Sequence, residues 1–357
     1  MDMQTTLPAL PVLPLALTIV PGQVLKLPRN NQGNTLRGAF GVAFRRLVCV
    51  PECRGARECP LQNACPYKLV FEPEPPPDSD RLSKNQDVPR PFVFRPPLVC
   101  DATAATGPYK TTYEAGEPFC FSLILFGKAV DYLPYFVLSF REVTRAGFGL
   151  NRATCELEEV QVQDLITGRG QPGERGLPAG SGVVYNKADQ LFHSPAVPTM
   201  GEYVSRRLRR LLCEPEGASG PRTLSVRFLT PTYLKHEGKE VRVPQFHHLL
   251  KRVRDRLNAL ATFYGPGPID ADFKGLGESA ERVPTIEANV RWVERSRTSS
   301  KTGQRHELSG VVGECVYDCS RLPGNDIREL IRWLLAGEVI HAGKHTAWGD
   351  GRYEVSC

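Results

Sequence analysis

The stretch that decides the fold is His341-Ala-Gly-Lys-His-Thr-Ala-Trp-Gly-Asp-Gly-Arg-Tyr-Glu-Val355, a basic, glycine-rich loop between a helical pattern and a short strand. A fainter copy, Ala146-Gly-Phe-Gly-Leu-Asn-Arg-Ala-Thr-Cys-Glu-Leu157, also follows a helical pattern and also runs into a strand. Glycines accept positive φ and let backbone N–H groups approach a phosphate, and Lys344 and Arg352 add positive charge. The alternative is a tight connection whose glycines only make a turn. The repetition favours a duplicated unit with a phosphate-bearing ligand.

The segments around the two loops predict the same order of elements twice: strand, helix, two strands, helix, strand. In the first half these segments are residues 15–25, 34–47, 91–94, 119–126, 131–143 and 153–162. In the second half they are residues 224–229, 244–263, a hairpin of 290–297 and 305–316 around a turn at 299–303, then 326–340 and 352–355. This order is that of a ferredoxin-like unit, and RNA-recognition modules share the topology.

The sequence therefore predicts an α+β fold of two tandem ferredoxin-like (RRM-like) domains with glycine-rich loops. Residues 1–186 form the first domain, which carries Cys-rich and Pro-rich insertions, residues 187–220 form a basic connector, and residues 221–357 form the C-terminal RNA-binding domain. A chain of 357 residues with 41% hydrophobic residues is long enough for two domains with cores of their own.

Composition argues against a membrane or secreted protein. No apolar run approaches the roughly twenty residues of a membrane span, and the apolar stretch 7–20 is broken by prolines and lacks a basic start. Eleven cysteines at scattered spacing indicate a reducing compartment, so we expect a cytoplasmic protein.

Positive charge recurs in local clusters, although the net charge is only +6. Three basic segments interleaved with apolar residues lie in the second half: Arg206-Arg-Leu-Arg-Arg-Leu-Leu212, Lys251-Arg-Val-Arg-Asp-Arg256 and Arg291-Trp-Val-Glu-Arg-Ser-Arg297. Any one of them is an ordinary solvated face, but together they are typical of a surface that follows a phosphate backbone. Trp292 and Trp348 are candidates for stacking on unpaired bases.

Four cysteines, Cys49, Cys53, Cys59 and Cys65, lie within one turn-rich stretch. Four thiolates can close a tetrahedral zinc site that staples a loop without a core of its own. The spacing differs from paired Cys-x-x-Cys, so an iron–sulfur cluster and simple buried thiols remain open. Any metal here is predicted to be structural, and no cofactor is expected for catalysis.

Several motifs together resemble one family, the RAMP-superfamily endoribonucleases that process precursor CRISPR RNA. They are Leu36-Arg-Gly-Ala-Phe-Gly41, the Cys-rich stretch ending Cys65-Pro-Tyr67, Arg90-Pro-Phe-Val-Phe-Arg95, Gly147-Phe-Gly-Leu-Asn-Arg152, Pro231-Thr-Tyr-Leu-Lys235, His341-x-Gly-Lys-x-Thr346 and Trp348-Gly-x-Gly-Arg-Tyr353. The resemblance implies binding of a CRISPR repeat RNA, contacts with other CRISPR effector subunits, and metal-independent cleavage. In that reaction a 2′-hydroxyl attacks the adjacent phosphate and leaves a 2′,3′-cyclic phosphate.

The chain departs from the family at the expected site of chemistry. Many members carry a catalytic histidine on or near the first helix, but no histidine precedes His193 here. Either the second half supplies the base, or another residue type replaces it, or the protein is a non-catalytic RNA-binding subunit.

The reaction needs a base, an acid and positive charge on the phosphate. The candidates are His341 or His236 for proton transfer, with Lys344 or Lys239 stabilising the phosphorane. The RNA-binding candidates are basic residues and loop glycines: Arg37, Arg152, Lys251, Arg254, Arg291, Arg297, Lys301, Arg305, Gly343, Gly349, Gly351 and Arg352.

Overall fold

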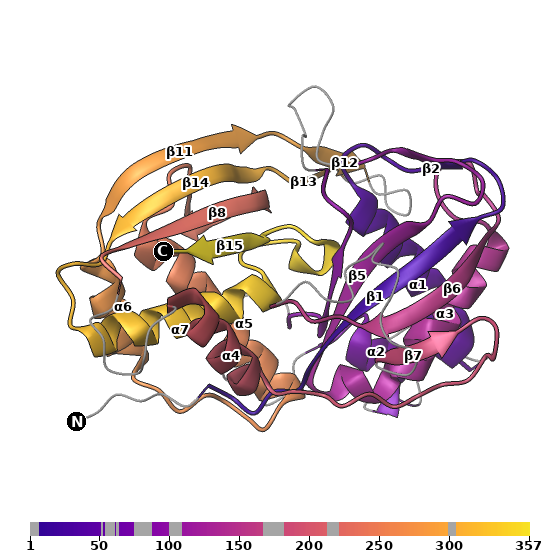
Figure 1. The fold of residues 1–357 in the computed structure, drawn as a ribbon, viewed down its shortest axis with the longest axis horizontal. Helices are drawn as coiled ribbons and strands as arrows, with labels where there is room; N and C mark the ends of the chain where they lie inside the picture. The colour runs from indigo at the N-terminus through magenta and orange to yellow at the C-terminus, as the bar shows by residue number, and fades with distance from the viewer. Residues whose placement is uncertain are drawn as a thin grey trace. The chain divides into compact units, whose positions relative to one another are not determined.

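The chain divides into two compact units (Figure 1). The computed structural model describes residues 7–50, 53, 61, 64–74, 88–99, 109–166, 182–212, 221–298 and 305–357. One unit is Pro11–Pro198, and the other combines the chain up to Leu10 with Thr199–Cys357. The division falls inside the predicted connector 187–220, where helix α4 (Met200–Leu212) packs on helix α7 (Gly324–Ile340) of the second unit.

The Pro11–Pro198 unit is built on a five-stranded antiparallel sheet in the order β3-β5-β1-β6-β7. The sheet strands are β1 (Val12–Pro21), β3 (Phe92–Arg95), β5 (Phe119–Phe126), β6 (Cys155–Val162) and β7 (Val183–Asn186). The helices are α1 (Gln32–Val48), α2 (Pro66–Val70), the 3-10 helix η4 (Gly127–Tyr132) and α3 (Leu133–Ala146), and a small ribbon pairs β2 (Leu25–Lys26) with β4 (Thr112–Tyr113). The helix predicted at residues 34–47 is confirmed as α1.

An aromatic core holds this unit together. Phe40 of α1 stacks on Phe136 of α3 with ring centroids 4.5 Å apart, and the buried rings of Phe92, Phe94 and Phe140 surround them. Every residue of β5 is buried, as expected of an apolar run in the middle of a covered sheet. The burial of these rings is the main source of the unit's stability.

The second unit has a four-stranded antiparallel sheet in the order β11-β14-β8-β15. Its sheet strands are β8 (Thr223–Thr232), β11 (Thr285–Val293), β14 (Gly310–Asp318) and β15 (Tyr353–Ser356). Helices α5 (Phe246–Tyr264) and α7 lie against one face of the sheet (Figure 1), with α6 (Phe273–Glu281) packed on both. The smaller elements are β9 (Lys235–His236), β10 (Lys239–Glu240), β12 (Ser296–Thr298), β13 (Arg305–Glu307) and the 3-10 helix η5 (Thr346–Trp348).

Close packing between α7 and β15 fixes the core of this unit. The Tyr353 hydroxyl donates to the Leu334 carbonyl at 2.7 Å, and a Cβ at Gly337 would lie 1.9 Å from that hydroxyl oxygen. Only glycine therefore leaves room for the buried ring. The predicted hairpin is confirmed, since β11 pairs with β14 and β12 with β13, and its predicted turn at 299–303 lies outside the described residues.

Both units follow the predicted β-α-β-β-α-β order, within antiparallel sheets. The predicted Cys-rich insertion falls largely outside the described residues. Among the helices described, none combines the length and apolar character needed to cross a bilayer.

Candidate active site and nucleic-acid interface

The second glycine loop closes on itself and on the end of β8. Ala342 N donates to the Gly351 carbonyl at 2.9 Å, and Gly351 N donates to the Pro231 carbonyl at 3.0 Å. Gly351 has φ of 75°, and a Cβ there would lie 1.8 Å from the Ala342 oxygen. The glycine is required by this backbone crossing, so here the loop acts first as a rigid connection.

The first glycine loop is also a structural connection. Leu150 N donates to the Lys26 carbonyl at 2.8 Å, and the Asn151 amide bonds both Val24 O and Lys26 N, at 2.7 and 3.0 Å. A Cβ at Gly149 would lie 2.5 Å from the Lys26 oxygen. These contacts support the turn interpretation for this copy.

A basic and aromatic surface lies next to the second loop. The Lys344 ammonium is 4.8 Å from the Tyr233 ring centroid and that of Lys235 is 5.9 Å from it. Tyr233 is in turn 6.0 Å from Trp292, which the Arg242 guanidinium approaches to 4.9 Å. We call these five residues the aromatic platform; cations over half-exposed rings are suited to stacked bases and phosphates.

His341 lies in the core. Its side chain is fully buried at 0% exposure, and its Nδ1 is 3.0 Å from the Asp350 carbonyl oxygen. His345 stacks on Trp348 with centroids 4.5 Å apart, and its Nε2 is 3.1 Å from the Glu307 carbonyl. A ring without solvent contact cannot reach a phosphate in this conformation, so the structure favours His236 over His341 for proton transfer.

Asp350 holds the loop through a buried ion pair. Its carboxylate pairs with Arg295, and both side chains are 7% exposed. Burial raises the pKa of Asp350 to about 6, although the Arg295 guanidinium acts in the opposite direction. The carboxylate therefore binds a proton more readily in the folded than in the unfolded protein.

We expect Asp350 to make stability fall as pH rises from about 4 to 6. The pKa of Asp350 in the folded protein exceeds the ordinary value of 3.8. The stability that Asp350 contributes is therefore complete below the pKa of the unfolded protein and is lost as pH rises through the folded pKa, by at most about 3 kcal/mol. Urea unfolding read by tryptophan fluorescence would measure this, since Trp292, Trp333 and Trp348 are the only tryptophans and all lie in the second unit. The difference in free energy of unfolding between wild type and Asp350→Asn should shrink as pH rises from about 4 to 6. A constant difference would contradict the prediction.

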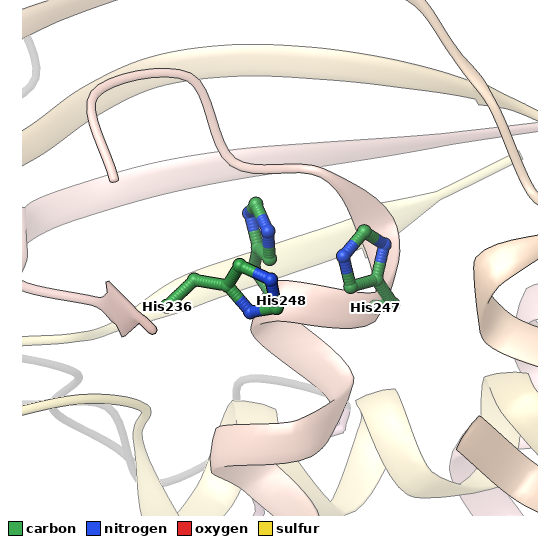
Figure 2. A group of neighbouring side chains, drawn as sticks. All are labelled: His236, His247 and His248. Atoms are coloured by element: carbon green, nitrogen blue, oxygen red, sulfur yellow. The ribbon is translucent and has the colours of Figure 1, made fainter. Parts of the chain in front are cut away.

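Three histidines from two elements converge at the start of α5 (Figure 2). His236 comes from the β9–β10 hairpin, and His247 and His248 from the first turn of α5. The ring centroid of His248 lies 4.4 Å from that of His236 and 4.2 Å from that of His247. We call these residues the histidine cluster; all three side chains are half-buried.

The surroundings of His247 and His248 favour the neutral form of these two imidazoles. Burial lowers the pKa of His248 to about 4, and the neighbouring histidines add to this effect. Burial also lowers the pKa of His247, and His236 adds to this effect. The positive charges of Lys251 and Arg252 act in the same direction on His248. These charges and the first-turn N–H groups of α5 make the position favourable for an anion such as a phosphate.

The remaining predicted RNA-binding residues have varied environments. Arg254 pairs with Asp255 at 2.6 Å and lies over Phe273, so it is engaged within the unit. Arg37 lies over Phe71 at 4.4 Å in the other unit. Lys251, Arg152 and Arg291 are exposed, and half-buried Arg352 lies 3.9 Å from Glu354. Lys301 lies outside the described residues, as do the side chains of Arg297 and Arg305.

Three of the four predicted metal-binding cysteines are described. Cys49 and Cys53 share a hydrogen bond. The pKa of the Cys49 thiol is raised to about 11, mainly by burial and to a smaller extent by Cys53 and Cys65. Cys59 lies outside the described residues. The zinc site remains a prediction.

Sequence reasoning selected His236 but not His247 and His248. The available signal was the His-His pair at the start of a helix that follows the Lys235–Lys239 turn. Tyr233 was named only as part of the Pro231–Lys235 motif. Its contact with Lys344 could not be predicted, because that contact joins segments far apart in sequence.

Comparisons with known proteins give matches to both halves of the chain. Residues 226–353 match the family model described as CRISPR-associated endoribonuclease Cas6, and residues 10–191 match AF_1859_N, described as an N-terminal domain. No curated protein matches the chain. Residues 10–191 are just over half of the chain, so the chain belongs to the family of the AF_1859_N model. More particularly, the match over residues 226–353 and the shared fold support a CRISPR-associated protein of the Cas6 type.

Solved structures support the fold. The chain is similar to a "Cas6 (TTHB231) product complex", with 14% identity, 97% of this chain and 99% of that chain covered, and a TM-score of 0.53. It is also similar to a "Partial Cas6-RT-Cas1–Cas2 complex", with 14% identity and a TM-score of 0.54. This match covers 100% of this chain and 47% of that chain. At these identities the likeness shows the fold alone.

Proposed function

We propose that this protein binds CRISPR repeat RNA and cleaves precursor CRISPR RNA without a metal ion, leaving a 2′,3′-cyclic phosphate. The observation that carries the proposal is that the Cas6 match, residues 226–353, falls on the unit holding both the histidine cluster and the aromatic platform. The similar "Cas6 (TTHB231) product complex" and "Partial Cas6-RT-Cas1–Cas2 complex" suggest that this chain also binds its product and other CRISPR proteins.

His236 is the proton-transfer residue in this proposal. An imidazole takes the proton of the 2′-hydroxyl, the 2′-oxygen bonds to phosphorus, and the bond from phosphorus to the 5′-oxygen breaks as that oxygen receives a proton. Histidine can serve in either proton transfer because its charge changes near neutral pH. His247 and His248 lie close enough to His236 to serve as the base in its place, since their lowered pKa values favour the neutral imidazole.

Lys239 is the better placed of the two candidate lysines for the phosphate. It is directly opposite His236 in the β9–β10 pairing, so the two side chains project from the same face of the hairpin. Lys344 belongs to the aromatic platform, where it contacts Tyr233. We assign Lys239 to the reacting phosphate and Lys344 to flanking RNA.

The same proposal gives the two units a common design. Each repeats the ferredoxin-like order of elements, so we interpret them as tandem ferredoxin-like domains, the first with a Cys-rich insertion that a zinc ion would stabilise. Exposed Lys251 and Arg291 extend the basic surface of the second unit, and the RNA backbone would follow these charges.

Incubating the purified protein with its repeat RNA in EDTA tests the proposal. We expect cleavage at the same rate with and without EDTA, because the imidazoles need no metal for proton transfer. The upstream product should resist a phosphatase until acid opens its cyclic phosphate. RNA binding without cleavage would instead identify a non-catalytic RNA-binding subunit, and cleavage that EDTA abolishes would exclude the metal-independent reaction.

A further inference from the structure

We propose that His236, His247 and His248 form a binding site for one divalent d-block cation, of the chemistry of zinc or cobalt, with three imidazole ligands and a fourth position open to water. The donor nitrogens of the three residues all lie within 4.8 Å of one another (Figure 2). Imidazole is a preferred ligand of these ions, and three protein ligands plus water is the pattern of an open zinc site.

Small side-chain movements would complete the geometry. Metal–nitrogen bonds of about 2.0–2.1 Å in a tetrahedron require nitrogens about 3.3–3.4 Å apart, so the donor nitrogens, now within 4.8 Å of one another, must approach by up to about 1.5 Å. His236 can move toward the others because it lies on a two-residue strand and its side chain is 36% exposed. The helix backbone of α5 fixes His247 and His248 as the less mobile pair.

The charged neighbours of the histidine cluster act on a bound cation in both directions. The positive charges of Lys251 and Arg252 oppose a dication. Two carboxylates attract it: that of Glu281 acts on His247, and that of Glu237 lies 4.0 Å from His236 Nε2. The charges of Lys251 and Arg252 and the N–H groups of the first α5 turn therefore weaken cation binding, and the two carboxylates offset part of this effect.

One existing contact competes with the ion. Gln245 N donates to His248 Nδ1 at 3.3 Å, as part of the capping box of α5. A metal at Nδ1 must displace this bond, and a metal at Nε2 must move the ring proton to Nδ1, where it would face the same N–H group. We therefore expect weaker binding than at a structural zinc site.

If the proposed function holds, the ion would also regulate cleavage. Coordination occupies the imidazole lone pair that would accept the proton of the 2′-hydroxyl. Zinc in excess should then inhibit the reaction, and EDTA should restore it.

Cobalt titration of the full-length, metal-free protein without RNA tests the site. Absorption from a four-coordinate cobalt ion should appear with one equivalent bound and without the near-ultraviolet band of a sulfur–cobalt bond, which separates the histidine cluster from Cys49, Cys53 and Cys65. Carrying Cys53→Ser and Cys65→Ser in all samples removes the thiol site. His236→Ala and His247→Ala should each weaken cobalt binding at least tenfold, while the exposed-site control His193→Ala should not.

Two results would overturn the site: binding unchanged in both cluster variants, or no binding by protein that circular dichroism shows to be folded. Failure of this inference differs from failure of the proposed function, because the titration contains no RNA. Cleavage in EDTA with no cobalt binding rejects only the metal site, and cobalt binding with no RNA cleavage rejects only the nuclease assignment.

Discussion

Replacing Arg207 by alanine is expected to lower the free energy of unfolding of the second unit by about 3–5 kcal/mol, the range for removing one partner of a buried ion pair. Arg207 Nε and Nη2 donate to the two oxygens of Glu338 at 3.0 and 3.1 Å, and Nη2 also donates to the Val355 carbonyl at 2.8 Å. Glu338 accepts from Val355 N at 2.7 Å. The alanine variant leaves this carboxylate, 9% exposed, without its guanidinium.

Tryptophan fluorescence during urea unfolding would measure the loss. Arg209→Ala is the matched control, since Arg209 is exposed on the same helix, and it should change stability by less than about 0.5 kcal/mol. The double variant Arg207→Met/Glu338→Leu should recover much of the loss, because it leaves no unpaired buried charge. Equal stability of Arg207→Ala and Arg209→Ala would show that the pair does not hold α4 on α7.

His236→Ala is expected to lower the single-turnover rate of RNA cleavage by about 10²- to 10⁴-fold, the usual contribution of a general acid or base. Affinity for the repeat RNA should remain within a few-fold of wild type, because the aromatic platform and the basic residues are unchanged. A gel-based time course at saturating protein gives the rate, and filter binding gives the affinity.

Two further variants make the assignment specific. His193→Ala, in the other unit, should cleave at the wild-type rate. His341→Ala should lose stability, since the buried ring bonds the Asp350 carbonyl, but its folded fraction should remain active. Wild-type cleavage by His236→Ala would remove His236 from the mechanism, and inactive but fully folded His341→Ala would restore the sequence-based alternative.

The sequence predicted the elements better than the site. The apolar spacing of Leu36, Phe40 and Phe44 predicted α1, and the alternation around residues 299–303 predicted a hairpin, because both patterns are local. Arg207 and Arg254 were grouped with phosphate-binding residues because charge runs usually face solvent. Their ion pairs with Glu338 and Asp255 could not be read from the runs themselves.

The terminal glycine loop shows where the boundary lies. The sequence by itself determined that His341–Val355 joins a helix to a strand, that glycine is needed there and that positive charge accompanies it, since these depend on residue type and near neighbours. Only the tertiary structure decided that His341 is buried while His236 meets His247 and His248. Burial and convergence depend on contacts between segments far apart in the chain, and local periodicity carries no information about them.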